Sequence, residues 1–197
     1  LIGLWQLHRL LKHFQIGDYN IGFVLLLVFG GSNLLHYTWM EPSMSHVYSF
    51  FAITTLLAVT ADYIIQPKTQ SMFLIFTLLG VVCIIRPVNV LIVLTFPFLF
   101  YMLKKEYTSE YFFNKKSWFL ASLIFFGIVF IQLLMYFLQL GQWWVWAYAN
   151  EGFNFFEPHF FEFLFSFRKG WFIYTPIAFL SIVMSFVVLK KKPRLLL

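Results

Sequence analysis

The stretch Gly141–Pro176, GQWWVWAYANEGFNFFEPHFFEFLFSFRKGWFIYTP, separates two apolar segments that are each long enough to cross a bilayer. Within it, Pro158 suits the first position of a helix, where its missing N–H would have no partner anyway. Gly170 suits the position after a helix end. We therefore expect Pro158–Phe167 to form a short helix that lies in the membrane interface.

This stretch also concentrates charged and imidazole side chains among aromatic rings. Glu162 follows His159 by one helical turn, so the two share one face of the expected helix. The rings could stack on sugars, or they could form only an aromatic belt that anchors the two spans. The charged and imidazole residues of the stretch are Glu151, Glu157, His159, Glu162, Arg168 and Lys169.

The composition predicts an integral membrane protein. Of the 197 residues, 61% are hydrophobic, 23% are aromatic and 11% are charged, and the mean hydropathy is +0.80, unlike a soluble domain. The net charge of +6 does not indicate nucleic-acid binding, because the cations lie at the ends of apolar segments, where membrane topology explains them. Cys83 stands alone in an apolar run, so the sequence offers no disulfide framework and no thiol metal cluster.

The apolar segments predict an all-α fold, a polytopic transmembrane helix bundle with about six membrane segments, in one domain over residues 1–197. Residues 141–170 form its outer interfacial loop. Leu1–Phe14 is the end of a preceding span or a membrane-surface helix, and the chain, which opens without Met, is expected to be part of a longer protein. The expected membrane segments are Tyr19–Trp39, Val47–Ile65, a short hairpin of Met72–Ile85 and Val90–Leu103, Trp118–Leu140 and Trp171–Leu189.

The cations predict the orientation of this bundle. If the lysines at 190–192 are cytoplasmic, alternation along the chain places most other cations on the same side. Arg86 then lies on the outer side, together with Glu41 and the charged residues of 141–170. Asp62, near the inner end of its span, is expected to meet a cation or the backbone at the cytoplasmic boundary. The cytoplasmic cations are Arg9, Lys12, Lys68, Lys104, Lys105, Lys115 and Lys116.

The outer turn Met40–His46 predicts an anion site. Pro42 would open the following helix, so the first backbone N–H groups, from Ser43 onward, would face outward without intrahelical partners. The N-terminus of a helix attracts anions, and Ser43 and Ser45 would be additional donors there. The alternatives are a plain helix–Pro–helix corner and, for His46, an imidazole packed in the core.

The turn Arg86-Pro87-Val88-Asn89 also predicts an anion site at a helix start. Pro87 opens the next helix, Asn89 supplies an amide, and Arg86 offers two parallel N–H donors to a phosphate. The two turns together could hold a lipid phosphate at the outer membrane surface. The alternative for Arg86 is a side chain that extends along the helix to reach water.

Oxygen and nitrogen ligands occur on the same outer side, enough in principle for a divalent cation. The spacing HFFE at 159–162 is not a specific ligand signature, so we expect no metal and no cofactor, with a divalent cation as the alternative. The ligand-type residues are Glu41, His46, Glu151, Glu157, His159 and Glu162.

Three motifs carry a family resemblance: TWMEPSMSHVYSFF (38–51), IIRPVNVLIVLTFPF (84–98) and ANEGFNFFEPHFFEFLFSFRKGWFIYTP (149–176). With them the chain resembles bacterial membrane glycosyltransferases of the GT-C fold, and is similar to the dolichyl-phosphate-mannose protein mannosyltransferase and aminoarabinose transferase group. The resemblance implies a multi-pass protein of the bacterial inner membrane. It also implies inverting transfer of a sugar from a polyprenyl-phosphate donor to a glycan, lipid or protein acceptor on the non-cytoplasmic face.

The resemblance also implies roles for individual residues. Arg86 would neutralise the phosphate leaving group, with Asn89, Ser43, Ser45 and His46 in the same phosphate-binding region. The family places its catalytic carboxylate in an outer loop after the first span, which this chain does not contain. The base is therefore expected upstream, and Glu41 is kept as a local candidate. Glu151, Asn154, His159, Arg168 and Lys169 would line the cavity or its outer lid.

Two other classes of function remain open. Transporters and lipid-handling proteins also use short, broken helices and buried charge, and an internal repeat would favour them; we find none. A non-catalytic membrane subunit is the other alternative, and it predicts that Arg86, His46 and Glu151 do not converge.

Overall fold

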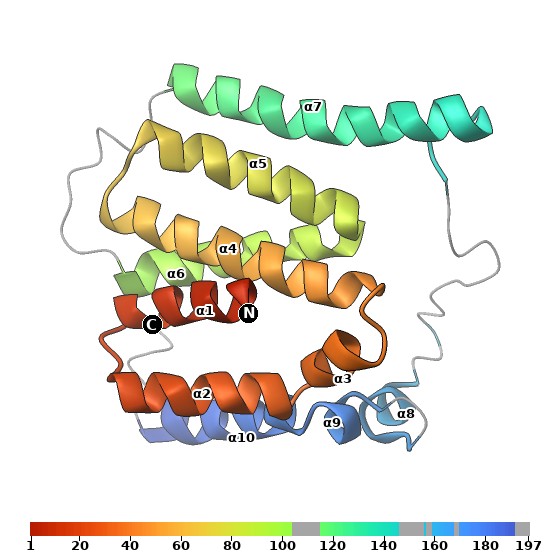
Figure 1. Cartoon of the computed structure of the whole chain (residues 1–197). Helices are drawn as coiled ribbons and strands as arrows, with labels where there is room; N and C mark the ends of the chain where they lie inside the picture. The colour runs from red at the N-terminus through yellow and green to blue at the C-terminus, as the bar shows by residue number, and fades with distance from the viewer. Residues whose placement is uncertain (104–114, 146–155, 157–158, 168–169, 192–197) are drawn as a thin grey trace. The chain divides into compact units, whose positions relative to one another are not determined.

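The computed structural model in Figure 1 describes residues 1–103, 115–145, 156, 159–167 and 170–191. Among them the regular structure is helical and no strand occurs, which confirms the all-α prediction. Two helices are long and apolar enough to cross a membrane, α4 (Ser45–Ile65) and α7 (Lys115–Leu140). At 1.5 Å per residue they are about 32 and 39 Å long, against about 30 Å of hydrocarbon. The six-segment bundle stays a prediction.

The chain divides into two compact units. Unit 1 comprises Leu1–Ile21 and Ser43–Ala147, and unit 2 comprises Gly22–Pro42 and Tyr148–Leu197. The predicted outer loop 141–170 falls partly in each unit, and much of it lies outside the described residues.

Helix α4 is the centre of unit 1. It contacts α1 (Ile2–His13), α5 (Thr69–Ile85), the 3₁₀-helix η1 (Pro87–Thr95) and α6 (Phe96–Leu103) (Figure 1). Its buried positions carry many alanine, serine and threonine side chains, which let neighbouring helices approach closely. The buried hydroxyls need partners, and Thr60, for example, donates to the Leu56 carbonyl at 2.7 Å.

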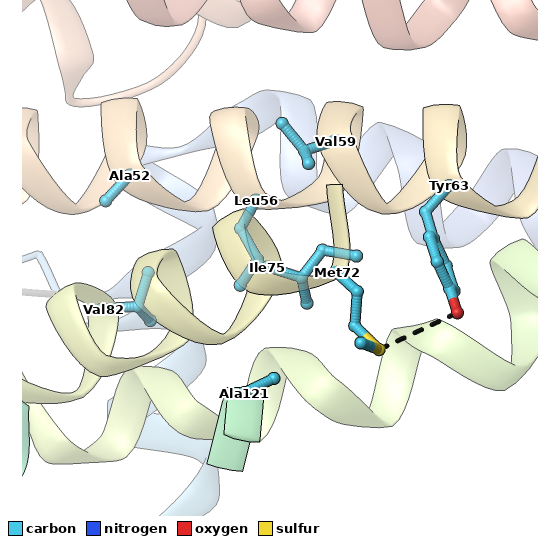
Figure 2. Close-up of a cluster of buried hydrophobic side chains, with 8 residues drawn as sticks. All are labelled: Ala52, Leu56, Val59, Tyr63, Met72, Ile75, Val82 and Ala121. Atoms are coloured by element: carbon cyan, nitrogen blue, oxygen red, sulfur yellow. Dashed lines mark hydrogen bonds between the residues drawn. The ribbon is translucent and has the colours of Figure 1, made fainter. Parts of the chain in front are cut away.

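Helix α5 packs between α4 and α7. In Figure 2 the side chains of α4, such as Leu56, point toward those of α5, such as Ile75. The Tyr63 hydroxyl lies 4.0 Å from the Met72 sulfur, across the α4–α5 hairpin. On the other side of α5, a Cβ added to Gly80 would come within 3.0 Å of Ile128 in α7, so this glycine permits the close approach of the two helices.

Helix α1 runs parallel to α4. Gly3, near its start, lies against Phe50, and Leu10 packs in the cluster that contains Ala58 and Ala61. At its end, Arg9 and His13 reach Asp62. Helix α1 therefore packs along α4, and the choice between the end of a span and a membrane-surface helix stays a prediction.

The predicted short hairpin corresponds to α5, η1 and α6, but its second arm differs from the prediction. It begins at Pro87 instead of Val90, and its first nine residues wind as a 3₁₀-helix. Its β-branched residues crowd an α-helix, which helps to explain the different winding. A 3₁₀-helix rises about 2.0 Å per residue, so η1 and α6 together extend about 30 Å, close to a bilayer's hydrocarbon thickness.

The predicted continuous span Tyr19–Trp39 is wrong. The helix α2 (Asp18–Gly30) ends at a Gly-Gly-Ser sequence, and α3 (Leu34–Trp39) begins after it. The Ser32 hydroxyl donates to the Val28 carbonyl at 2.5 Å and accepts from the Leu34 N–H at 3.2 Å, so one side chain bonds both helix ends.

The predicted span Trp171–Leu189 is also broken, into α9 (Trp171–Tyr174) and α10 (Pro176–Lys191). Pro176 has no N–H to continue α9, and it opens α10 instead. The predicted interfacial helix is shorter than expected, as α8 (Phe160–Phe165). Gly170 does not end it but precedes α9, and a Cβ there would collide with the backbone of Ser166.

Candidate functional site

The two ends of unit 1 carry different chemistry. The start of α4, the end of α5 and the start of η1 meet at one end, and the ends of α1 and α4 and the starts of α5 and α7 lie at the other (Figure 1). His46 and Arg86 belong to the first end. The second end carries Lys12, Lys68, Lys115 and Lys116. The structure thus separates Arg86 from these lysines, as the sequence predicted.

Four residues form the candidate site, which we name the Arg86 cluster: His46, Ser49, Arg86 and Asn89. The Arg86 Nη1 atom lies 3.4 Å from Nδ1 of His46. The side-chain amide of Asn89 donates to Oγ of Ser49 at 2.9 Å. The four side chains come from α4 and from the α5–η1 turn, segments far apart in the sequence.

The local sequence explains why these residues meet. Pro87 disfavours helical angles for the residue before it, and Arg86 is accordingly extended, with φ −154 and ψ 117. The chain therefore leaves α5 and turns back, and the Asn89 N–H donates to the Arg86 carbonyl at 2.9 Å. On α4, His46 and Ser49 are three residues apart and share one helical face.

The charge of Arg86 is not neutralised within the described part of the chain. The side chain is half-buried, and no carboxylate of a described residue forms an ion pair with it. A guanidinium stays charged at all ordinary pH values, and a partly desolvated cation is unfavourable without an anion or water. The cluster is therefore suited to bind an anion.

Arg9, at the other end of unit 1, has its partners within the fold. Its Nη2 donates to Asp62 at 2.6 Å and its Nη1 to Gln6 at 2.8 Å. His13 Nε2 lies 2.8 Å from the second Asp62 oxygen. This confirms the prediction that Asp62 meets a cation. On the exposed side of α1, Lys12 pairs with Asp18 and holds the pKa of that carboxyl below its ordinary value.

The turn before α4 differs from the prediction. Helix α4 begins at Ser45, so Pro42 does not open it, and Met44 precedes the helix without a side-chain cap. Ser43 is exposed and Ser45 half-buried. Glu41 belongs to unit 2, where its carboxylate lies 4.0 Å from His36.

The remaining predicted site residues lie in or near the 141–170 stretch. Glu151, Asn154, Arg168 and Lys169 are outside the described residues. His159 precedes α8, is exposed, and lies 3.8 Å from Glu162, which confirms that the two share one face. Within the described ranges no group of three or more His, Cys, Asp or Glu side chains could hold a metal ion. The expectation of no metal stays a prediction.

Ser49 is the site residue that sequence reasoning missed, because it lies inside an apolar segment assigned to a span. Its spacing of three from His46 was the available signal.

Comparisons of the chain with protein-family models, curated proteins and solved structures gave no match. The functional argument therefore depends on the geometry of the Arg86 cluster.

Proposed function

We propose that this chain is the membrane part of a glycosyltransferase that takes a sugar from a polyprenyl-phosphate donor, and that the Arg86 cluster binds the donor phosphate. The observation that carries the proposal is a half-buried arginine without a carboxylate partner among the described residues, at the end of unit 1 away from the lysines. The resemblance to GT-C glycosyltransferases supports the same proposal.

The chemistry of the reaction suits such a site. In inverting transfer the acceptor oxygen bonds to the anomeric carbon, the bond from that carbon to the phosphate oxygen breaks, and the electron pair stays on the phosphate. Arg86 would stabilise this growing charge through two parallel N–H donors. The acceptor proton passes to a carboxylate acting as general base.

His46 contributes a hydrogen-bond acceptor to Arg86 in this proposal. Because a guanidinium only donates, His46 Nδ1 accepts the hydrogen bond from Arg86.

The surface of α7 supports a membrane setting. Only 6% of its apolar window is buried, against 61% for α4. A long apolar helix with so little cover is unfavourable in water and compatible with lipid. With the lysine end in the cytoplasm, the Arg86 cluster would face the opposite leaflet, where a polyprenyl tail can enter the bilayer while its phosphate reaches the cluster.

The test is sugar transfer from polyprenyl-phosphate sugars by the protein in nanodiscs. Arg86→Ala should lower kcat/KM about 100-fold or more, because it removes the phosphate donors. Arg86→Lys should lower it about tenfold, because a lysine supplies charge without the paired geometry. Lys116→Ala, an exposed cation at the start of α7, is the matched control and should leave the rate unchanged. Normal turnover in both Arg86 variants would refute the proposal.

A further inference from the structure

We infer that Ser49 and Asn89 are positioning residues, whose hydrogen bond holds the Arg86 guanidinium at the place where it meets phosphate. This inference rests on the proposed function of Arg86. It assigns Asn89 to the support of the site, whereas the sequence suggested direct phosphate binding, and it gives a role to the buried Ser49.

The cluster consists of two parallel contacts between the same two elements. Arg86 faces His46, and Asn89 faces Ser49. On each element the two residues are three positions apart. Arg86 is the extended residue just before η1, and Asn89 is the third residue of η1. The turn from α5 into η1 therefore places two side chains against two positions on one face of α4.

Asn89 connects the backbone of Arg86 to α4. Its own N–H donates to the Arg86 carbonyl at 2.9 Å, and its side-chain amide donates to Ser49 at 2.9 Å. Ser49 is only 8% exposed, so water cannot easily replace this bond. By contrast, the Arg86–His46 contact is long, at 3.4 Å, and is too weak to fix the guanidinium alone.

The start of η1 takes part in the same contacts. The Asn89 N–H bond to the Arg86 carbonyl closes the turn, and the Asn89 side chain attaches that turn to α4 through Ser49. Loss of the Ser49 hydroxyl should therefore loosen the start of η1 and spread the positions of the Arg86 guanidinium.

The first test measures polyprenyl phosphate binding in nanodiscs. Ser49→Ala and Asn89→Ala should each weaken binding about tenfold, and the double variant should lose no more than either alone. In an Arg86→Ala background, Ser49→Ala should have no further effect, because Ser49 acts through Arg86. Ser49→Thr keeps the hydroxyl and should restore much of the affinity. The matched control is Thr60→Val, since the Thr60 hydroxyl is also buried but donates to the Leu56 carbonyl within α4.

The second test needs no ligand. A nitroxide label at Val88, which is 63% exposed and lies between Arg86 and Asn89, should be restricted in the wild type. It should become more mobile in Ser49→Ala but not in Thr60→Val. An unchanged label mobility, or an equal Ser49→Ala effect on binding with and without Arg86, would overturn the inference. If Ser49→Ala changes the label mobility but the wild-type protein does not bind polyprenyl phosphate, the positioning role of the Ser49–Asn89 bond is upheld and the proposed function is refuted.

Discussion

Arg9 and Arg86 lie at opposite ends of unit 1, and both are half-buried, but their surroundings differ. Arg9 meets a carboxylate at 2.6 Å, a glutamine at 2.8 Å and the ring of Trp5 at 5.3 Å from the centroid. Arg86 meets a histidine at 3.4 Å, and no described acid pairs with it. The first arginine holds α1 against α4, whereas the second is available to an external anion. Burial and residue type alone would not have distinguished them.

The difference between the two arginines should disappear when Arg86 is given a carboxylate partner. His46→Glu places a carboxylate beside the guanidinium, so Arg86 should resemble Arg9 and polyprenyl phosphate binding should fall about 30-fold, or about 2 kcal/mol. Thermal unfolding should show no loss of stability. His46→Gln, which keeps a polar side chain without charge, is the control and should lose much less affinity. Equal affinity of His46→Glu and wild type would show that phosphate does not use this charge.

Removing Arg9 should affect stability and not binding. Arg9→Ala leaves Asp62 with the His13 imidazole as its partner among the described residues, and the Arg9–Asp62 pair is about one-third exposed. We expect a loss of about 1–2 kcal/mol in unfolding free energy, below the cost of a fully buried broken pair. Reversible unfolding in mixed micelles measures it. Asp62→Asn should cost a similar amount, and the double variant should cost less than the sum. A loss of phosphate affinity in folded Arg9→Ala would contradict the division of roles.

The smallest effect concerns the exposed pair of Lys12 and Asp18. The Lys12 ammonium lowers the pKa of the Asp18 carboxyl from its ordinary value of 3.8. The pair therefore contributes its stability in full above the ordinary pKa, and the contribution is lost as the pH falls through the lowered pKa in the folded protein. Asp18→Asn should make the free energy of unfolding less dependent on pH, measured by unfolding between about pH 5 and 2. If the unfolding free energies of wild type and Asp18→Asn change equally with pH, the Lys12–Asp18 pair makes no such contribution.

The sequence predicted the features that depend on local patterns. The apolar runs of α4 and α7, the role of Pro87 and the cation partner of Asp62 follow from composition, proline geometry and the cost of unpaired charge. The broken spans escaped prediction because hydropathy does not register a helix break: Gly30 and Gly31 are apolar enough to continue a span, and Pro176 lies inside one. The Ser49–Asn89 bond depends on how the chain turns from α5 into η1, which residue patterns do not reveal. The predicted roles of Glu151, Asn154, Arg168 and Lys169 stay predictions.

The nine residues of η1 also set the length of the second arm of the hairpin. A 3₁₀-helix is longer per residue than an α-helix by about 0.5 Å, so rewinding η1 would shorten this arm by about 4.5 Å. That difference is comparable to the spread in hydrocarbon depth among natural membranes. If this arm crosses a bilayer, its 3₁₀ winding lets it cover the hydrocarbon depth with fewer residues than an α-helix would need.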